Sequence, residues 1–335
     1  MQHVINEKIY MEKRVQLYDH LPLATPLSLH VFPSFYCNLK CNYCLHSLTR
    51  DELEEMSFNR QSMSFDVYQK AIDDLLEFPQ KLKALIFAGH GEPLIHQDIA
   101  KMVKYAKQKD ISERVEIVTN GTLLTPELSN HLISAGLDRL RISIQGVTSE
   151  KYKTITSKSI DFDQLVQNIS YFYESRQNCE VYVKIVDAAL TDDNEKEQFM
   201  KTFEAISDSA TIEYIIPFVN NIDYDNLGAD LSKTKMGLQS GKTNICSMPF
   251  YMLVLNPDGS VLPCCSTEIP IIYRNSQQDC FFNIWNSDRR KTFLLNQLKN
   301  KDQNEVCRRC SVPMYGLQEG DYLDSNVERL LEIYK

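Results

Sequence analysis

The stretch "FYCNLKCNYCLHS", Phe35 to Ser47, places Cys37, Cys41 and Cys44 in one short loop with the spacing CxxxCxxC. Three thiolates can hold a [4Fe–4S] cluster through three of its irons and leave the fourth iron open to a ligand that is not protein. A structural zinc site usually needs a fourth protein ligand, and His46 could supply one two residues after Cys44. This loop alone therefore fits either kind of metal centre.

The composition limits the class of protein and the cellular compartment in which these thiols can occur. The chain has 335 residues, of which 43% are hydrophobic and 24% charged, which is ordinary for a soluble globular protein with room for two domains. A formal net charge of −9 gives no electrostatic support for non-specific nucleic-acid binding. No apolar run approaches the ~20 residues that span a bilayer, and the first residues are too polar and acidic for a signal peptide. We predict a cytoplasmic protein without nucleic-acid or membrane partners, where ten cysteines indicate metal binding rather than disulfides.

From Leu27 onward, short apolar runs alternate with amphipathic segments. The runs predict strands within 27–35, 82–89, 114–121, 139–146, 180–187 and 211–217, and the segments between them predict helices within 64–78, 96–109, 125–136, 161–176 and 193–207. Ser64, Thr125 and Asp193 are expected N-caps, and Gly136 is an expected helix stop. Strands joined by helical crossovers favour a parallel sheet and an α/β fold.

Polar and glycine-rich sequence follows successive predicted strands. The cysteine-containing loop follows the first strand, "GHGEP" (89–93) the second and "TNGT" (119–122) the third, while the fourth carries Ser143 and Gln145. Parallel α/β folds place their ligand sites at the carboxyl ends of the strands. These positions are therefore expected to converge on one pocket.

This combination resembles the radical SAM superfamily over most of the chain. CxxxCxxC after the first strand is that superfamily's signature, Tyr43 occupies the usual aromatic place, and "GHGEP" is similar to its GGEP loop, with His90 where a glycine usually stands. The resemblance implies a partial (βα)6 TIM-like barrel over 28–216 after an N-terminal extension, 1–27. It also implies S-adenosylmethionine (SAM) contacts from Tyr43, Gly89, Gly91, Glu92, Asn120, Ser143 and Gln145, with the [4Fe–4S] cluster on Cys37, Cys41 and Cys44.

The chemistry implied by this resemblance is radical chemistry. An electron from a donor such as flavodoxin or ferredoxin cleaves SAM to methionine and a 5′-deoxyadenosyl radical, which abstracts hydrogen from an unactivated C–H bond. The cofactors carry that step, and the protein supplies orientation and excludes side reactions.

A second group of cysteines lies in the last quarter of the chain. Strands "FYMLVL" and "SVLPC" around the turn "NPDG" form a predicted hairpin with Cys246 before it and Cys264 after it, and "CRRC" supplies Cys307 and Cys310. Such pairs suit zinc ribbons and iron–sulfur clusters equally.

Beside a radical SAM core, the spacing CX12GX4C followed by CxxC resembles the SPASM/twitch extension. No cysteine follows Cys310, so the resemblance implies the twitch-like form in a small domain, 246–335, joined through a connecting segment, 217–245. One auxiliary [4Fe–4S] cluster is then expected on Cys246, Cys264, Cys307 and Cys310, with Cys280 as a competing ligand.

The fate of the substrate radical depends on what lies near it. A nearby oxidised cluster suits loss of an electron, which gives dehydrogenation or crosslinking. A reachable thiol would instead donate hydrogen and give epimerisation. Cys265, next to Cys264, is the candidate donor, although an inert buried cysteine is the simpler interpretation.

Substrate class follows only from comparison with the family. Only 27 residues precede the first predicted strand, too few for the leader-peptide-binding domain of many peptide-modifying members. We therefore expect a carbohydrate-like small molecule, with a peptide in a maturase-like enzyme as the alternative. A zinc-stabilised binding protein without turnover is the alternative from another class.

Overall fold

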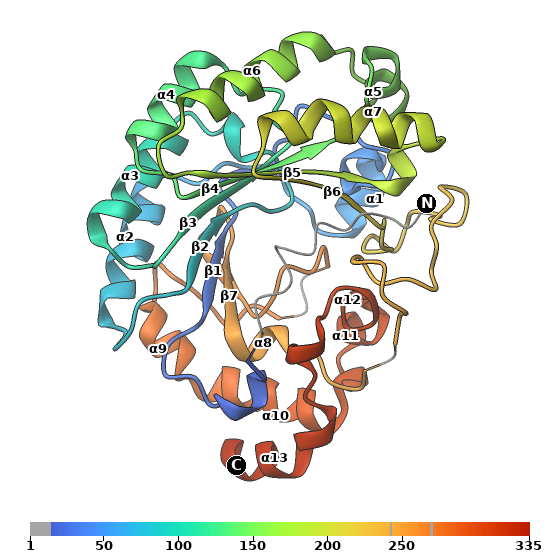
Figure 1. The fold of residues 1–335 in the computed structure, drawn as a ribbon. Helices are drawn as coiled ribbons and strands as arrows, with labels where there is room; N and C mark the ends of the chain where they lie inside the picture. The colour runs from blue at the N-terminus through green and yellow to red at the C-terminus, as the bar shows by residue number, and fades with distance from the viewer. Residues whose placement is uncertain (1–14, 242, 269–270) are drawn as a thin grey trace.

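Nine strands form a single sheet in the computed structural model, which describes residues 15–241, 243–268 and 271–335 (Figure 1). The strands are β1 (Ser28–Val31), β2 (Ala84–Phe87), β3 (Val115–Thr119), β4 (Arg139–Ile144), β5 (Glu180–Val186), β6 (Ser209–Glu213), β7 (Met252–Leu255), β8 (Ser260–Leu262) and β9 (Arg274–Asn275). Their order is β6-β5-β4-β3-β2-β1-β7-β8-β9. The six predicted core strands are all present.

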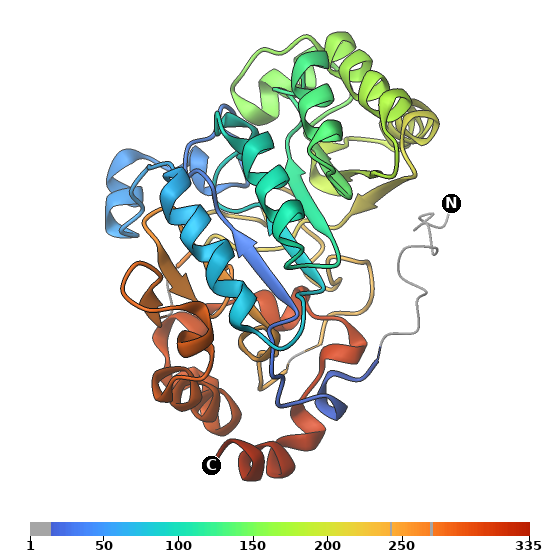
Figure 2. The ribbon, with the colours of Figure 1, turned by 90° about the vertical axis from the view of Figure 1, so that its left-hand side faces the viewer.

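Helices cover the outer side of the parallel strands and gather again near the C-terminus (Figures 1 and 2). The helices are α1 (Arg50–Glu55), α2 (Phe65–Asp74), α3 (Ile99–Lys109), α4 (Pro126–Ser134), α5 (Ser149–Thr156), α6 (Phe162–Ser175), α7 (Asp193–Phe203), α8 (Met248–Tyr251), α9 (Phe281–Trp285), α10 (Asp288–Asn300), α11 (Glu305–Arg309), α12 (Val312–Tyr315) and α13 (Val327–Tyr334). Strands β1 to β6 pair in parallel throughout, joined by helical crossovers. This confirms the partial TIM-like barrel.

The predicted C-terminal hairpin is present and continues the barrel sheet. β7 pairs in parallel with β1, with His30 opposite Val254, and β8 and β9 then add antiparallel. Gly259 ends the turn with a φ of +83°, which a side chain would strain. The first hairpin strand begins two residues later than expected because residues 248–251 form α8. The cysteine-rich region is thus attached to the barrel by backbone hydrogen bonds.

The helix ends follow the local sequence with one shift. The Ser64 and Thr125 side chains cap α2 and α4 as predicted, by accepting hydrogen bonds from the backbone N–H of Val67 and Leu128. The expected cap of α7 was wrong by one residue. Asp192 is the cap, because its extended backbone directs its carboxylate to the N–H of Glu195.

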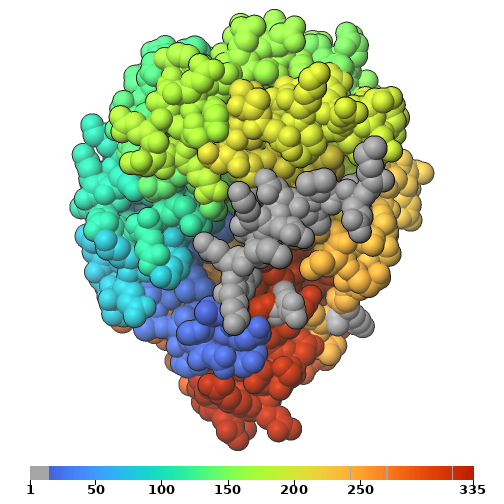
Figure 3. Space-filling model, in the orientation of Figure 1, coloured from blue at the N-terminus to red at the C-terminus, as the bar shows by residue number. Residues whose placement is uncertain are grey.

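Of the four clusters of buried apolar side chains among the described residues, the two largest hold these parts together. The larger core lies between the sheet and its outer helices, with fully buried Tyr68 and Phe172 among its members. A second core joins Leu17 and Leu21 to α10 and α13, so the segment before β1 packs against the C-terminal helices. The connecting segment lies on the surface between the residues of α7 and the C-terminal residues (Figure 3). Among the described residues, none of the helices combines the length and apolar character needed to cross a membrane.

Candidate active site

A cavity of about 350 Å³ opens at the carboxyl ends of the parallel strands. We refer to it as the carboxyl-end cavity. Ten residues singled out from the sequence line it: Cys37, Cys41, Tyr43, Cys44, Gly89, Gly91, Glu92, Asn120, Ser143 and Gln145. The convergence expected from strand order is therefore present in the fold.

The three thiols lie on the cysteine loop, residues 37–44, which is fixed from both sides. The N–H groups of Lys40 and Asn42 donate to carbonyls at the end of α5, at 3.0 and 2.9 Å. Burial raises the pKa of Cys37 to about 12, and burial together with the neighbouring thiols raises the pKa of Cys41. Thiolates in such a place need a cationic partner, because ligand deprotonation and metal binding are coupled. The iron ions of a cluster fit this donor set.

The alternative zinc ligand, His46, does not face the thiols. Its Nε2 atom contacts the carbonyl oxygen of His90, and its ring packs edge-on against Phe58. Its backbone N–H instead points to the thiol of Cys44. The His46 side chain is therefore not placed to complete a metal site with the three thiols.

Glu92 joins the loops that follow β2 and β3. Its buried carboxylate accepts hydrogen bonds from Thr119 Oγ1 at 2.6 Å, from the N–H of Asn120 at 2.8 Å and from the N–H of Leu94 at 2.9 Å. Burial raises its pKa, and these donors oppose the rise. Glu92 thus holds the cavity wall in place as well as lining it.

Asn120 joins the loop after β3 to the cysteine loop. Its Nδ2 donates to Asn38 Oδ1 at 2.9 Å, and its Oδ1 accepts from the N–H and hydroxyl of Thr122 at 2.9 and 2.6 Å. Its amide also lies close enough to Cys37 to lower that thiol's pKa against the effect of burial. The Asn120 side chain is therefore oriented before any ligand binds.

The two glycines of "GHGEP" permit close packing. A Cβ on Gly91 would lie 2.2 Å from the Ser34 carbonyl oxygen, and one on Gly89 would lie 2.3 Å from the Phe32 ring. Gly89 also has a φ of +119°. Backbone alone can form this wall of the cavity.

His90, which stands at the unusual position of that loop, faces away from the cavity. Its Nε2 is 3.1 Å from the carbonyl oxygen of Ser266, and its ring packs against Phe32, Phe35 and Phe58. Desolvation lowers its pKa to about 4, so it is neutral. The departure from the GGEP pattern therefore links the barrel to the loop that carries Cys264 and Cys265.

The remaining predicted residues lie on the opposite wall. Tyr43 donates a hydrogen bond from its hydroxyl to Gln145 Oε1, and Gln145 Nε2 donates to the Ser143 carbonyl at 2.8 Å. Ser143 and Gln145 occupy alternate positions of the β4 stretch, so both face the cavity.

Three charged residues that also line the cavity were not predicted from the sequence. Lys184 and Lys235 direct Nζ toward one carboxylate oxygen of Glu213, at 2.9 and 3.2 Å. Desolvation lowers the pKa of Lys184 to about 7. Burial by itself would raise the pKa of Glu213, but the two lysines hold that pKa well below its usual range. Lys184 and Glu213 could have been found from the sequence, because each is a charged residue inside an apolar run, "EVYVKIVD" and "TIEYIIP". Lys235 could not, because only the tertiary fold brings the connecting segment to this cavity.

The second cysteine group surrounds a small enclosed space of about 20 Å³, which we call the four-cysteine pocket. Its thiols come from Cys246, Cys264, Cys307 and Cys310. Burial raises the pKa of each of them. Gln297 Nε2 lies 3.3 Å from Cys307 Sγ and donates to it. Four desolvated thiols with a polar neighbour fit a fully protein-ligated cluster.

The two other cysteines of this region lie outside that pocket. Cys280 begins α9, and its thiol lies 3.5 Å from a carboxylate oxygen of Glu77. Cys265 borders a separate space of about 30 Å³ beside Cys310 and Phe218. Phe218 also borders the carboxyl-end cavity. Burial raises the pKa of Cys265 to about 11, so it carries its S–H proton.

A parallel partial barrel with three cysteines at its strand ends and four more in a C-terminal extension defines an iron–sulfur enzyme. Residues 31–205 match the radical SAM superfamily, and the chain belongs to that superfamily. Residues 246–311 match SPASM, an iron–sulfur cluster-binding domain. The cofactors are therefore a [4Fe–4S] cluster, SAM and auxiliary iron–sulfur in the C-terminal region.

Curated relatives share either the core or most of the chain. The AdoMet-dependent heme synthase of Methanosarcina barkeri is 24% identical over 340 residues, which cover 86% of this chain and 91% of that protein. The tungsten-containing aldehyde ferredoxin oxidoreductase cofactor-modifying protein of Pyrococcus furiosus is 33% identical over 135 residues, 36% of this chain. The match spans only 35% of that relative's length.

Solved structures share the fold. Streptococcus suis SuiB bound to S-adenosylmethionine aligns with a TM-score of 0.61 and 14% identity, over 93% of this chain and 79% of that one. BtrN in complex with AdoMet and 2-DOIA aligns with a TM-score of 0.56 and 17% identity, over 88% of this chain and 97% of that one.

Proposed function

We propose that this protein abstracts a hydrogen atom from a C–H bond of a carbohydrate-like small molecule and thereby oxidises or epimerises it. The observation that carries the proposal is the carboxyl-end cavity, where three thiols, a pre-oriented polar wall and a charged base meet. When bound, the cofactors supply hydrogen-atom abstraction through one-electron cleavage of SAM. The rest of the work is binding and orientation by this chain.

Each predicted residue has a role in this proposal. Cys37, Cys41 and Cys44 hold the first cluster. Glu92 and Asn120 keep the SAM-binding loops in register, and the SAM site is completed by Tyr43, Gly89, Gly91, Ser143 and Gln145. The four-cysteine pocket holds one auxiliary cluster, and a ferredoxin or flavodoxin supplies the electron. The division into a barrel (28–216), connecting segment (217–245) and auxiliary domain (246–335) is part of the same proposal.

Oxidation and epimerisation differ in the group that reacts with the substrate radical. In oxidation, the substrate would give up one hydrogen atom, which ends in 5′-deoxyadenosine, one electron and one proton; the residues Cys246, Cys264, Cys307 and Cys310 would hold the cluster that supplies the electron acceptor, and the proton would go to solvent. In epimerisation, the Cys265 thiol would donate a hydrogen atom to the opposite face of the carbon, and the resulting thiyl radical would return to the thiol by taking up one electron from the ferredoxin or flavodoxin donor and one proton from solvent. Its protonated state and its position behind Phe218 support that role.

Anaerobic turnover tests the proposal. Reconstituted protein with dithionite, SAM and a panel of nucleotide-linked sugars, aminocyclitols and peptides is analysed for 5′-deoxyadenosine and product mass. We expect a sugar-like compound to increase 5′-deoxyadenosine formation. In D₂O, an oxidised product lacks two hydrogen atoms, whereas an epimerised product gains one deuterium in wild type and none in Cys265→Ala. Reconstituted protein that forms no 5′-deoxyadenosine under any condition refutes the reaction class.

Peptide modification is the second candidate. Its support is the fold shared with SuiB, which has been crystallised with its precursor peptide SuiA and aligns with a TM-score of 0.55. The same panel decides between the two candidates, because only a peptide would then increase 5′-deoxyadenosine formation.

A further inference from the structure

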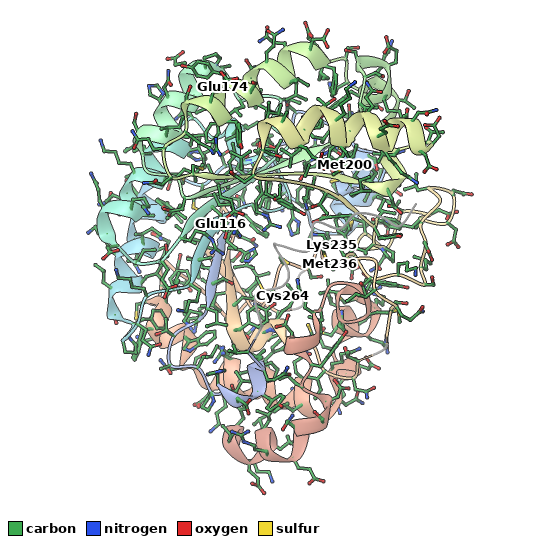
Figure 4. The ribbon with its side chains drawn as sticks, viewed as in Figure 1. Glu116, Glu174, Met200, Lys235, Met236 and Cys264 are labelled. Carbon is green, nitrogen blue, oxygen red and sulfur yellow. The ribbon has the colours of Figure 1, made fainter. Side chains whose placement is uncertain are left out.

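A second cavity, of about 400 Å³, lies inside the barrel at the amino ends of the strands. We refer to it as the amino-end cavity. Arg114 immediately precedes β3, and Arg139 and Glu180 begin β4 and β5, so this cavity lies opposite the cysteine loop. Figure 4 shows Glu116 on the inner side of the sheet, with Lys235 and Met236 of the connecting segment across the lumen.

The lining of the amino-end cavity carries more positive than negative charge. Its cations are Arg114, Arg139, Arg141 and Lys235, and its carboxylates are Glu116 and Glu180. The local excess is two positive charges, in a chain whose net charge is −9. Cations gathered in a concave site with low-dielectric walls attract anions from solution.

The three arginines are not equally paired. Arg139 Nε lies 2.7 Å from a Glu180 oxygen, and Arg114 Nε donates to Glu116. Arg141 is ion-paired with Glu116, but its nearest nitrogen is 3.8 Å from the carboxylate, beyond hydrogen-bond distance, and its guanidinium carbon lies 5.8 Å from the centre of the Tyr182 ring. In the ranges that the structure describes, Arg141 donates no hydrogen bond, although its side chain is 26% exposed. Its guanidinium fork is thus available to a ligand.

A purely structural role accounts for Glu116 and Arg139 but does not explain the excess of positive charge in the amino-end cavity. Glu116 and Glu180 supply two carboxylates for three guanidinium groups, and an uncompensated charge in a partly buried site is costly. A bound anion would remove that cost. Arginine is well suited to this role because its fork matches the oxygens of phosphate and carboxylate groups.

The two cavities are adjacent. Lys235 lines both of them. Along β4, Arg139, Arg141 and Ser143 alternate with outward residues, so one inward row continues toward Gln145 at the SAM end. Four residues of strand separate Arg141 from Gln145, which is about 13 Å at a strand's rise per residue. A ligand anchored at Arg141 can therefore extend to the reaction site.

We propose that the amino-end cavity binds the phosphate-bearing tail of the substrate, with Arg141 as the main donor and Lys235 as the second. The inference rests on the proposed function and makes it more specific, because it assigns a phosphorylated compound, such as a nucleotide-linked sugar, as the substrate class. The reacting carbon then lies toward the carboxyl-end cavity.

Calorimetric binding of inorganic pyrophosphate to the cluster-reconstituted protein tests this assignment. We expect saturable binding to wild type, at least 10-fold weaker binding to Arg141→Gln and to Lys235→Gln, and unchanged binding to Arg329→Gln. Arg329 is an exposed arginine on α13 and is the matched control. Saturating SAM should leave the pyrophosphate affinity unchanged, because SAM occupies the other cavity.

Three results would overturn the inference. Equal pyrophosphate affinity in wild type and Arg141→Gln would show that Arg141 does not form the binding site. Loss of pyrophosphate binding in saturating SAM places the probe in the SAM cavity. Equal affinity for citrate at matched ionic strength replaces phosphate with carboxylate as the ligand class. If Arg141→Gln does not fold by circular dichroism, Lys235→Gln decides the question, since Lys235 belongs to the connecting segment and not to a strand of the sheet. Binding is measured without turnover, so a failure of the proposed reaction is recognised separately, by the absence of 5′-deoxyadenosine.

Discussion

The two thiol sites of this protein differ in sequence spacing and in the space beside them. The cysteine loop brings three thiols from eight consecutive residues to the edge of a cavity of about 350 Å³. The four-cysteine pocket gathers thiols spread over residues 246–310 around about 20 Å³. Under the proposed assignment, three thiol ligands beside a large cavity would leave an iron accessible to a small molecule, whereas four thiol ligands around a small space would leave none. The proposal therefore places bond cleavage at the first site and electron storage or structure at the second.

Removing the first site should have the largest effect. Replacing Cys37, Cys41 and Cys44 with Ala should abolish 5′-deoxyadenosine formation under dithionite and lower the iron content by about four atoms per chain. Mass spectrometry and an iron assay measure both. Cys280→Ala is the control and should keep full activity, because its thiol lies beside Glu77. Persistent SAM cleavage in the triple variant would show that the cysteine loop is not the reactive site.

Removing the second site should stop product formation but not SAM cleavage. The double variant Cys307→Ala, Cys310→Ala should also lose about four irons, while its cysteine loop stays intact. With the electron acceptor gone, 5′-deoxyadenosine should form without matching product, as measured by the ratio of the two compounds. Unchanged product yield would make the auxiliary centre structural and end its role as acceptor.

Loosening the wall of the first site should weaken SAM binding without loss of iron. Asn120→Ala removes the side-chain hydrogen bonds from Asn120 to Asn38 and Thr122, and we expect about 10- to 100-fold lower SAM affinity by analogy with other supporting-shell changes. Equilibrium binding to the reconstituted protein measures this. Asn130→Ala, on the outer helix α4, is the matched control. Equal affinity in both variants would remove Asn120 from the site.

Breaking the contact between the two regions should have the smallest effect, on stability alone. His90→Ala loses packing against three aromatic rings and the contact with Ser266, at a cost of about 2–3 kcal/mol. Thermal unfolding should show a midpoint several degrees lower, with iron content and SAM affinity retained. A loss of SAM affinity instead would place His90 in the cofactor site itself.

Much of this architecture can be predicted from local sequence. Alternating apolar runs and amphipathic segments indicate the six parallel strands and their helices, because strand and helix periods are properties of neighbouring residues. Chain order then places the cysteine loop, "GHGEP" and "TNGT" at one edge of the sheet. Apart from Leu39 and Thr119, the residues that line the carboxyl-end cavity from these loops are accordingly among those predicted.

Contacts between segments that are distant in the sequence could not be predicted from the local pattern. Nothing in the apolar run 252–255 indicates that it pairs with β1 rather than forming a separate sheet, since any exposed strand edge offers the same backbone hydrogen bonds. Likewise Lys235 stands in a polar connecting segment, and only the path of that segment brings its ammonium group to Glu213 and between the two cavities. The kinds of cofactor can be predicted from cysteine spacings along the chain, because those spacings are local, whereas the charged lumen of the barrel arises from packing between segments that are distant in the sequence.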